Sequence, residues 1–246
     1  MFEPTPSRQD PSQHSDAHHA TTHAHKLDMS DTEAVRPLTV AEYCERVYAQ
    51  AQGDPDRIPW HHGHTDDVLL NWLNRDAPRL VRPGCRAVVV GCGLGDDVAE
   101  LDARGFDVLG FDVSGTAVHW AGLRHPRCAQ RFIRADLLDP PARMTGRFDL
   151  VIEVSTLQSL PPEIRSIGAA NIARLTATRG IVLSVDCGRL NEEPGDNAEG
   201  PPWPLSASEL ESLLTTAGLG CLCRPQALPV PGEPDHVRVM GVFVKG

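Results

Sequence analysis

The sequence predicts a doubly wound α/β domain built on a seven-stranded, mostly parallel sheet. From residue 86 onward, short apolar runs alternate with segments in which apolar residues recur at helical spacing. Strands that alternate with helices imply right-handed crossovers and a parallel sheet whose two faces are both covered. The last two apolar runs have no helix between them, so we expect these two strands to pair antiparallel.

The segment before the sheet predicts helices and no strand. Apolar residues recur at helical spacing in residues 39–51 and again in residues 66–76. Between these two stretches, glycine and proline interrupt the pattern. We therefore expect residues 34–83 to form a helical cover over a core of residues 84–246.

The expected strands of the core are apolar runs bounded by turn residues. Residues 86–90 (RAVVV) form a continuous apolar run, which is typical of a strand buried on both faces. The further strands are expected at 106–112, 131–136, 147–154, 180–186, 219–226 and 236–246. Helical spacing of apolar residues predicts helices at 96–105, 114–124, 161–176 and 206–218.

Composition limits the classes of protein to which the chain can belong. Its 246 residues, of which 41% are hydrophobic and 23% charged, suffice for one large domain. No apolar run approaches the ~18–20 residues that a membrane span needs, and the polar N-terminus lacks the pattern of a targeting peptide. We therefore expect a cytoplasmic protein without a membrane partner. The formal net charge of -10 also disfavours nucleic acid, whose binding normally needs a basic surface.

Residues 1–33 differ from the rest of the chain in composition. They are rich in His, Asp, Ser, Thr and Pro with few large apolar residues, so we expect a disordered, histidine-rich tail. These histidines lack a carboxylate or cysteine framework that would fix the geometry of a metal ion. The seven cysteines of the chain form no C-x-x-C pair, which predicts reduced, buried thiols. We expect no metal site.

A glycine-rich loop, Gly91-Cys92-Gly93-Leu94-Gly95, joins the first expected strand to the helix that follows it. Glycine lets the backbone turn sharply and lets a ligand approach closely. In a doubly wound sheet, this loop lies at the carboxyl end of the strand, where ligands bind. Asp112 ends the second strand and is placed to accept hydrogen bonds from ribose hydroxyls. Asp136 and Leu137 follow the third strand and are placed to meet an adenine, although Asp136 also suits a loop or helix cap.

The loop also indicates the class of nucleotide. Its G-x-G-x-G spacing departs from the dinucleotide fingerprint G-x-G-x-x-G, and Asp96 and Asp97 follow at once. Two carboxylates at a helix start would repel a pyrophosphate. They suit a ligand without phosphates whose amino-acid end carries an ammonium group. S-adenosylmethionine meets these conditions, whereas NAD and ATP fit poorly.

Four segments together resemble a known family. They are Ile58-Pro59-Trp60 followed by Gly63, VVVGCGLGDDV at 88–98, VIEVSTLQSLPPEIR at 151–165, and Gly200-Pro201-Pro202-Trp203. With them, residues 84–244 resemble class I S-adenosylmethionine-dependent methyltransferases. More narrowly, the chain is similar to the group of thiopurine S-methyltransferases and thiol/halide methyltransferases. It departs from many class I enzymes at Gln158, where they have a histidine.

The resemblance implies a Rossmann-like sheet, S-adenosylmethionine as cofactor, and a set of binding residues. The residues expected to bind the cofactor are Trp60, Gly91, Cys92, Gly93, Gly95, Asp112, Val113, Asp136, Leu137, Glu153 and Val154. The residues expected to contact the acceptor are Tyr48, Gln158, Arg189 and Trp203.

A histidine cluster follows Trp60 and is the obvious place for a catalytic base, because imidazole titrates nearest to neutral pH. His62 and His64 alternate in the loop, so both side chains can point to one side. We take these two as the candidate catalytic residues. Two alternatives stay open: an exposed loop without a catalytic role, and a metal site for which the sequence offers no third ligand.

These observations predict methyl transfer to a small-molecule acceptor, at the sulfur or nitrogen of a thiol or heteroaromatic compound, as in specialised biosynthesis. One alternative is a small-molecule O-methyltransferase with His62 or His64 as base. A second is a protein that binds S-adenosylmethionine without catalysis. Amino-methylation of nucleic-acid bases is disfavoured, because Glu153-Val154-Ser155-Thr156 stands where an Asn/Asp-Pro-Pro-Tyr/Phe element is expected. The sequence gives no oligomeric state.

Overall fold

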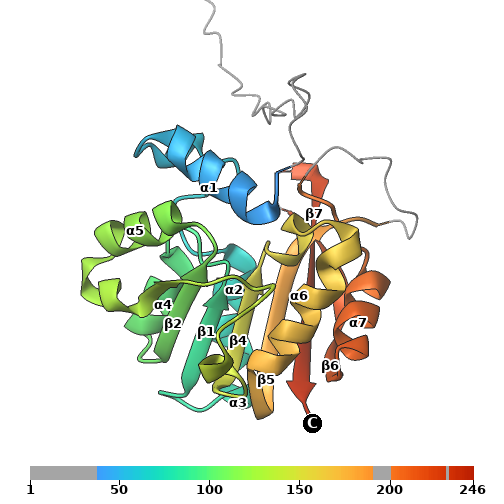
Figure 1. The fold of residues 1–246 in the computed structure, drawn as a ribbon. Helices are drawn as coiled ribbons and strands as arrows, with labels where there is room; N and C mark the ends of the chain where they lie inside the picture. The colour runs from blue at the N-terminus through green and yellow to red at the C-terminus, as the bar shows by residue number, and fades with distance from the viewer. Residues whose placement is uncertain (1–37, 191–200, 231–232) are drawn as a thin grey trace, which may run out of the picture. The chain divides into compact units, whose positions relative to one another are not determined.

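Seven strands form the sheet at the centre of the computed structural model (Figure 1), which describes residues 38–190, 201–230 and 233–246. The strands are β1 (Arg86–Val90), β2 (Asp107–Asp112), β3 (Phe132–Arg134), β4 (Phe148–Val154), β5 (Thr176–Gly188), β6 (Leu219–Val230) and β7 (Glu233–Lys245). Their order is β3-β2-β1-β4-β5-β7-β6. Strands β1 to β5 pair in parallel, while β7 is antiparallel to both β5 and β6. The predicted fold class is confirmed.

Helices cover both faces of the sheet. One face carries α2 (Asp67–Arg75), α3 (Ala77–Leu80), α4 (Asp96–Ala103) and α5 (Gly115–Arg124), and the other carries α6 (Pro162–Leu175) and α7 (Ala207–Thr216). The 3-10 turns are η1 (Pro55–Arg57), η2 (Pro126–Arg131), η3 (Ala142–Met144) and η4 (Leu157–Ser159).

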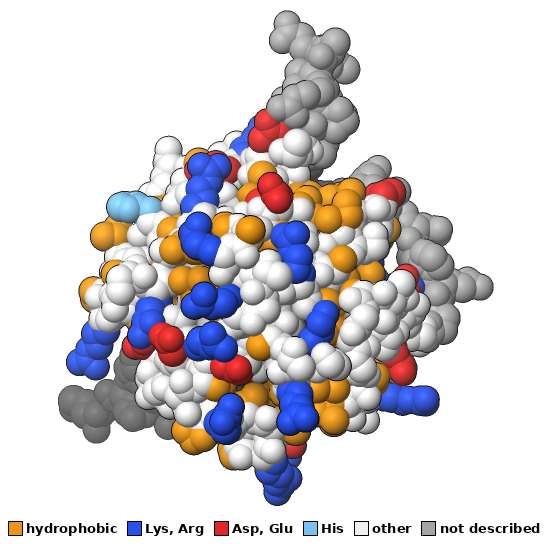
Figure 2. All heavy atoms as spheres, turned by 60° about the horizontal axis from the view of Figure 1, so that its bottom comes forward, with side chains coloured by type: hydrophobic (Ala, Val, Ile, Leu, Met, Phe, Trp, Pro, Cys, Tyr) orange, Lys and Arg blue, Asp and Glu red, His pale blue; other side chains and the backbone are white. Residues whose placement is uncertain are grey.

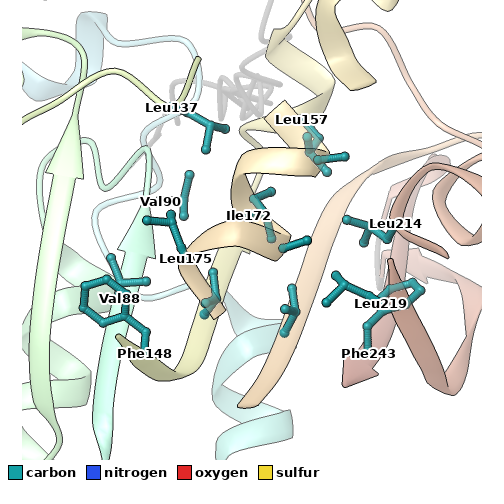
Figure 3. Packing of buried hydrophobic residues seen from close by; sticks show 14 of the residues in the cluster. Val88, Val90, Leu137, Phe148, Leu157, Ile172, Leu175, Leu214, Leu219 and Phe243 are labelled. Atoms are coloured by element: carbon teal, nitrogen blue, oxygen red, sulfur yellow. The ribbon is translucent and has the colours of Figure 1, made fainter. Parts of the chain in front are cut away.

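The core consists of two apolar layers, one on each face of the sheet. Along β1, Ala87 and Val89 belong to the layer under α2 and α4, and Val88 and Val90 to the layer under α6. Figure 3 shows Ile172 of α6 between Val90 and the side chains that α7 and β7 contribute. This alternation explains the continuous apolar run of β1, because both of its faces are buried.

Three strands are longer than the sequence predicts, and one of them, β7, begins at Glu233 instead of residue 236. β5 begins at Thr176, directly after α6, because Thr176 pairs with Phe148 at the start of β4. β6 continues to Val230 although it contains Pro225 and Pro229. Proline is tolerated there because β6 is an edge strand, which needs a hydrogen-bonded partner on one side only.

The helix α1 (Val40–Ala51) lies across the end of the sheet at which β1, β2 and β4 terminate (Figure 1). It begins with a capping box in which Thr39 and Glu42 bond each other's backbone N–H. Its buried face packs Val47 and Tyr48 against Leu94 of the glycine-rich loop and Ala117 of α5.

A carboxylate also attaches α1 to the start of α5. Glu45 accepts hydrogen bonds from the hydroxyls of Ser114 (2.7 Å) and Thr116 (2.5 Å). Residues Arg36–Gly246 form one compact unit. The predicted division at residue 83 between cover and core stays a prediction, and the predicted tail 1–33 lies outside the described residues. No helix in the described ranges is long and apolar enough to cross a membrane.

Replacing Glu45 with alanine should loosen α1 without unfolding the sheet. Hydrogen bonds to a charged acceptor contribute about 1.5–3 kcal/mol. Partial burial raises the pKa of Glu45, but the hydrogen bonds from Thr116 and Ser114 outweigh it and hold that pKa below its usual range. The stabilisation is therefore present at neutral pH and is lost as the pH falls through the lowered pKa.

Hydrogen–deuterium exchange at pH 7 checks this prediction. Backbone amides of residues 40–51 should exchange faster in Glu45→Ala than in the wild type, while those of β1 should not change. Gln50→Ala, at an exposed position of the same helix, serves as the control. Equal protection of α1 in the wild type and in Glu45→Ala would contradict the attachment.

Candidate active site

A cavity of about 630 Å³ lies between α1 and the carboxyl ends of the central strands. Most of the site residues predicted from the sequence line it. These are Tyr48, Trp60, His62, His64, Gly91, Cys92, Gly93, Gly95, Asp112, Val113, Asp136, Leu137 and Val154. Four predicted residues are not part of the lining: Glu153, Gln158, Arg189 and Trp203.

The glycine-rich loop requires its glycines for two reasons, the sharp turn of the backbone that the sequence predicts and a lack of space for side chains. Gly91, Gly93 and Gly95 all have positive φ, at 59°, 51° and 90°, where side chains with a Cβ are strained. Neighbouring side chains also fill the space that a Cβ would take. At Gly91 it would overlap the Thr156 hydroxyl, and at Gly95 it would come within 2.7 Å of the Phe132 ring.

Asp112 joins the glycine-rich loop to the end of β2. Its carboxylate accepts hydrogen bonds from the backbone N–H of Gly93 (3.0 Å) and of Ser114 (2.9 Å). Burial raises the pKa of Asp112, and these two N–H groups oppose that rise. Each oxygen has two lone pairs, so the carboxylate can accept further hydrogen bonds from the hydroxyls of a ribose.

The part of the cavity lined by the residues after β2 and β3 is apolar with one carboxylate. Val113, Ala135, Leu137 and Leu138 line it together with Asp136. Asp136 accepts a hydrogen bond from the Leu138 backbone N–H (2.8 Å). This hydrogen bond uses one oxygen of the Asp136 carboxylate, so the other oxygen can accept a hydrogen bond from a ligand in the cavity.

Aromatic side chains of the cover close the cavity. The Trp60 indole donates a hydrogen bond to the Tyr48 hydroxyl (2.9 Å), and the two rings meet edge to face at 5.8 Å. Burial holds the pKa of Tyr48 well above its usual value, so its hydroxyl stays protonated. Cys44 also lines the cavity, and burial next to Asp112 and Asp136 raises its pKa to about 12. Cys44 is therefore a neutral thiol and not a nucleophile.

The histidine loop places a third histidine at the cavity. His62 and His64 are exposed at its rim, and His64 Nδ1 lies 2.7 Å from the Thr65 carbonyl oxygen. His61 lines the cavity too, but only 9% of its side chain is exposed, and its Nδ1 lies 3.6 Å from Asp96 Oδ2. Burial lowers the pKa of His61, although Asp96 opposes this shift. The sequence does not single out His61, because burial cannot be recognised in a run of neighbouring histidines.

Glu153 has partners that keep it away from the cavity. Its fully buried carboxyl group accepts hydrogen bonds from the backbone N–H of Thr156 (2.8 Å) and Leu157 (2.9 Å), and it also contacts the Ser184 hydroxyl. Ser184 in turn bonds Asp186 (3.1 Å). Burial and the neighbouring Asp186 raise the pKa of Glu153 well above its usual value. Glu153 thus holds the loop after β4 in place through hydrogen bonds to its backbone.

The other three predicted residues outside the lining hold the segment before α7. Gln158 accepts a hydrogen bond from the Cys187 backbone N–H, and its own carbonyl oxygen accepts one from the backbone N–H of Trp203 (2.8 Å). Arg189 donates to the Pro204 carbonyl oxygen (2.5 Å) and pairs with Glu209 (2.5 Å). These contacts account for the positions of Gln158, Arg189 and Trp203 without a ligand.

Several lining residues were missed by sequence reasoning. Asp66 caps α2, Arg238 lies in β7, and Ser155 and Thr156 follow β4. In the sequence, Arg238 looks like any polar residue of a strand in which polar and apolar residues alternate. It reaches the cavity only because β7 pairs with β5 in the sheet. Within the described part of the chain, no group of three His, Cys, Asp or Glu residues is arranged to hold a metal ion.

Comparison with known proteins points to one family. The model of the thiopurine S-methyltransferase family matches residues 50–231. A probable thiol methyltransferase 2 of Arabidopsis thaliana is 27% identical over 165 residues, which cover 65% of this chain and 68% of that protein. A thiopurine S-methyltransferase of Xanthomonas campestris pv. campestris is 29% identical over 178 residues, covering 64% of this chain and 79% of that protein.

A solved structure shows the same fold with the expected cofactor. Magnesium protoporphyrin IX methyltransferase from Synechocystis PCC 6803, with bound S-adenosylmethionine, superimposes with a TM-score of 0.64. The match covers 87% of this chain and 100% of that one at 19% identity.

Replacing Asp112 with asparagine should weaken the binding of S-adenosylhomocysteine about 30- to 100-fold, because charged hydrogen bonds to the ribose are lost. Isothermal titration calorimetry measures the affinity, and thermal unfolding shows whether the variant is folded. Asp139→Asn, at an exposed position outside the lining, is the matched control. Undiminished affinity in Asp112→Asn would refute the assignment of Asp112 to the ribose.

Replacing Glu153 with glutamine should reduce the pH dependence of stability. The folded chain keeps Glu153 protonated at pH values where the unfolded chain has released that proton, because its pKa is raised from 4.5. Stability is therefore lost as the pH rises above about 4.5. Glutamine is uncharged and can accept the same backbone N–H bonds.

Urea unfolding at pH 5 and pH 8 checks this prediction. The loss of unfolding free energy between the two pH values should be smaller in Glu153→Gln than in the wild type. Glu163→Gln, at an exposed position in α6, should behave like the wild type. The same pH-dependent loss in all three proteins would show that Glu153 ionises normally.

Proposed function

This chain belongs to the thiopurine S-methyltransferase family, and from that premise we propose that its acceptor is a small, uncharged thiol or heteroaromatic sulfur compound. The chain is an S-adenosylmethionine-dependent methyltransferase of small molecules. The observation that carries the proposal is the cavity, in which the glycine-rich loop, Asp112 and the histidine loop meet under aromatic side chains. A cytoplasmic location and a place in biosynthesis are part of the proposal.

The cofactor supplies a methyl group on a sulfonium sulfur, which a nucleophile takes by in-line displacement. The chain then has to orient the two reactants and exclude water. We assign the ribose to Asp112 and the adenine to Val113, Asp136 and Leu137. The hydrogen-bonded pair of Trp60 and Tyr48 covers the site and excludes water.

The charges around the cavity favour an uncharged acceptor. Most of the charged side chains in the lining are carboxyl groups, those of Asp66, Asp96, Asp97, Asp112 and Asp136. Among the described residues of the lining, Arg238 is the only Lys or Arg. An acidic acceptor would enter this site against several carboxylates, and a buried charge without a partner costs several kcal/mol.

His61 is the residue of the histidine loop best placed to accept a proton from a thiol. It is buried in the cavity wall, and its lowered pKa keeps it neutral at pH 7. Asp96 lies beside its Nδ1 and can hold the ring in one orientation. His62 and His64 lie at the exposed rim and remain the alternatives, as does methyl transfer to oxygen with one of them as base.

The proposal excludes nucleic acid as a partner because of the net charge of -10. Charge is unevenly distributed, however. On the face that Figure 2 brings forward, which includes the lower end of the molecule in Figure 1, opposite α1, Lys and Arg side chains are more prominent than Asp and Glu. This face is remote from the cavity, so it offers no route by which a nucleic-acid base reaches the cofactor.

A matched pair of acceptors tests the proposal. Phenylmethanethiol, an alkyl thiol that is mostly protonated at pH 7, should be methylated with a kcat/KM about 10-fold or more above that of 4-(mercaptomethyl)benzoate, because the added carboxylate meets like charge. Mass spectrometry of the products from S-adenosylmethionine measures the transfer. A preference for 4-(mercaptomethyl)benzoate, or transfer to nucleic acid or protein alone, would contradict the proposal. Bound cofactor with no transfer to any acceptor would favour the non-catalytic alternative.

His61→Asn should lower kcat/KM about 100-fold for an alkyl thiol, which is mostly protonated at pH 7, and much less for the more acidic thiophenol. The difference arises because an acceptor that is already ionised needs no base. Steady-state kinetics of His61→Asn, His62→Asn and His64→Asn with both acceptors give the comparison. An equal loss for both acceptors in His61→Asn, or a selective loss in another variant, would reject His61 as the base.

A further inference from the structure

Arg238 has donors for which the protein provides no acceptor. Its side chain is 17% exposed and lines the cavity. Nη2 pairs with Asp66 Oδ2 (3.0 Å) and donates to the Ser155 hydroxyl (3.3 Å). Nε is buried and unpaired, and Nη1 has no acceptor among the described residues. A buried guanidinium normally has acceptors for its N–H groups, because an unpaired donor costs about 1–3 kcal/mol.

A free acceptor lies in the same part of the cavity. Asp97, in the first turn of α4, accepts a hydrogen bond from the Asp66 backbone N–H through Oδ1 (3.1 Å). Its Oδ2 accepts from no described residue. Burial raises the pKa of Asp97 to about 7, Asp66 and Asp96 add to the shift, and the Asp66 N–H and Arg238 oppose it. A cation placed beside Asp97 would favour its ionised form.

The three charged residues lie next to the glycine-rich loop. Asp97 follows Gly95 by two positions. Arg238 bonds Ser155, and the adjacent Thr156 fills the space that a Cβ on Gly91 would need. Free donors and a free acceptor therefore adjoin the loop that follows β1, where a ligand carrying both a negative and a positive group would find partners for both.

We propose that Arg238, Asp97 and Asp66 form the binding site for the amino-acid end of S-adenosylmethionine. The guanidinium of Arg238 binds the carboxylate, and Asp97 binds the ammonium group. Asp66 positions both, since its side chain pairs with Arg238 and its backbone N–H bonds Asp97.

The charge count favours the cofactor over the acceptor as the partner of Arg238. The cofactor carries one carboxylate, and Arg238 is the only Lys or Arg in the described lining. If Arg238 bound the acceptor, the carboxylate of the cofactor would lie among aspartates without a cation. A purely structural role is the other possibility, because Arg238 also pairs with Asp66.

Three ligands separate these roles by calorimetry, without any acceptor present. They are S-adenosylhomocysteine, its decarboxylated form, which keeps the amine, and 5'-methylthioadenosine, which lacks the whole amino-acid end. Arg238→Gln should weaken S-adenosylhomocysteine about 10- to 100-fold, the range of a charge-assisted hydrogen bond, and leave the decarboxylated form and 5'-methylthioadenosine within about 2-fold. Asp97→Asn should weaken both amine-bearing ligands and leave 5'-methylthioadenosine unchanged.

The control is Arg224→Gln, on the neighbouring strand β6, where the side chain is 85% exposed and outside the lining. It should bind all three ligands like the wild type. Equal weakening of all three ligands by Arg238→Gln would establish a structural role, and unchanged affinity for S-adenosylhomocysteine would assign Arg238 to the acceptor. Either result overturns the proposal. Because no methyl transfer is measured, the outcome is independent of the acceptor proposed above.

Discussion

The carboxylate of Asp112 is the constraint on which the arrangement of the cavity depends. One oxygen bonds the Gly93 N–H in the glycine-rich loop, and the other bonds the Ser114 N–H at the start of α5. The Ser114 hydroxyl caps α5 through the Ala117 N–H and donates to Glu45 of α1. A buried carboxylate at the end of β2 therefore fixes the positions of the glycine-rich loop, of α5 and of α1. The same oxygens retain lone pairs for the hydroxyls of a ribose, so the residue that holds the site together can also bind the ligand.

A second buried polar group fixes the other wall of the cavity. Glu153, Ser184 and Asp186 form a connected set at the ends of β4 and β5, and two backbone N–H groups of the following loop bond the Glu153 carboxyl. Such a group is costly to bury unless it is protonated or fully bonded. The raised pKa of Glu153 and its hydrogen bonds meet that requirement. The loop after β4 is thereby held in place, which puts Ser155 and Thr156 beside Gly91 and Arg238.

The features of the fold that depend on local sequence pattern are the ones that can be predicted best. The alternation of apolar runs predicts the sheet and its two covered faces, and β1 has the predicted bounds. The residues at the ends of β1, β2 and β3 could be selected because parallel strands bring their carboxyl ends to one edge. The extension of β6 past its prolines could not be predicted, because it depends on β6 being at the edge.

The differences between the predicted site residues and the residues that line the cavity have a related cause. Glu153 lies near the end of its strand, as Asp112 does, but its side chain is buried among Ser184 and the N–H groups of the following loop. The sequence alone cannot distinguish a carboxyl group that faces a ligand from one that holds a loop in place. Arg238 lies far from the glycine-rich loop in sequence and reaches it only because β7 inserts beside β5. Burial likewise separates His61 from its exposed neighbours.

A crystal structure of the complex with S-adenosylhomocysteine tests the central claim most directly. We expect electron density for one molecule in the cavity, with its ribose hydroxyls on Asp112 and its amino-acid end beside Arg238. Density at another place, or a ligand in the cavity whose ribose does not contact Asp112, would contradict it.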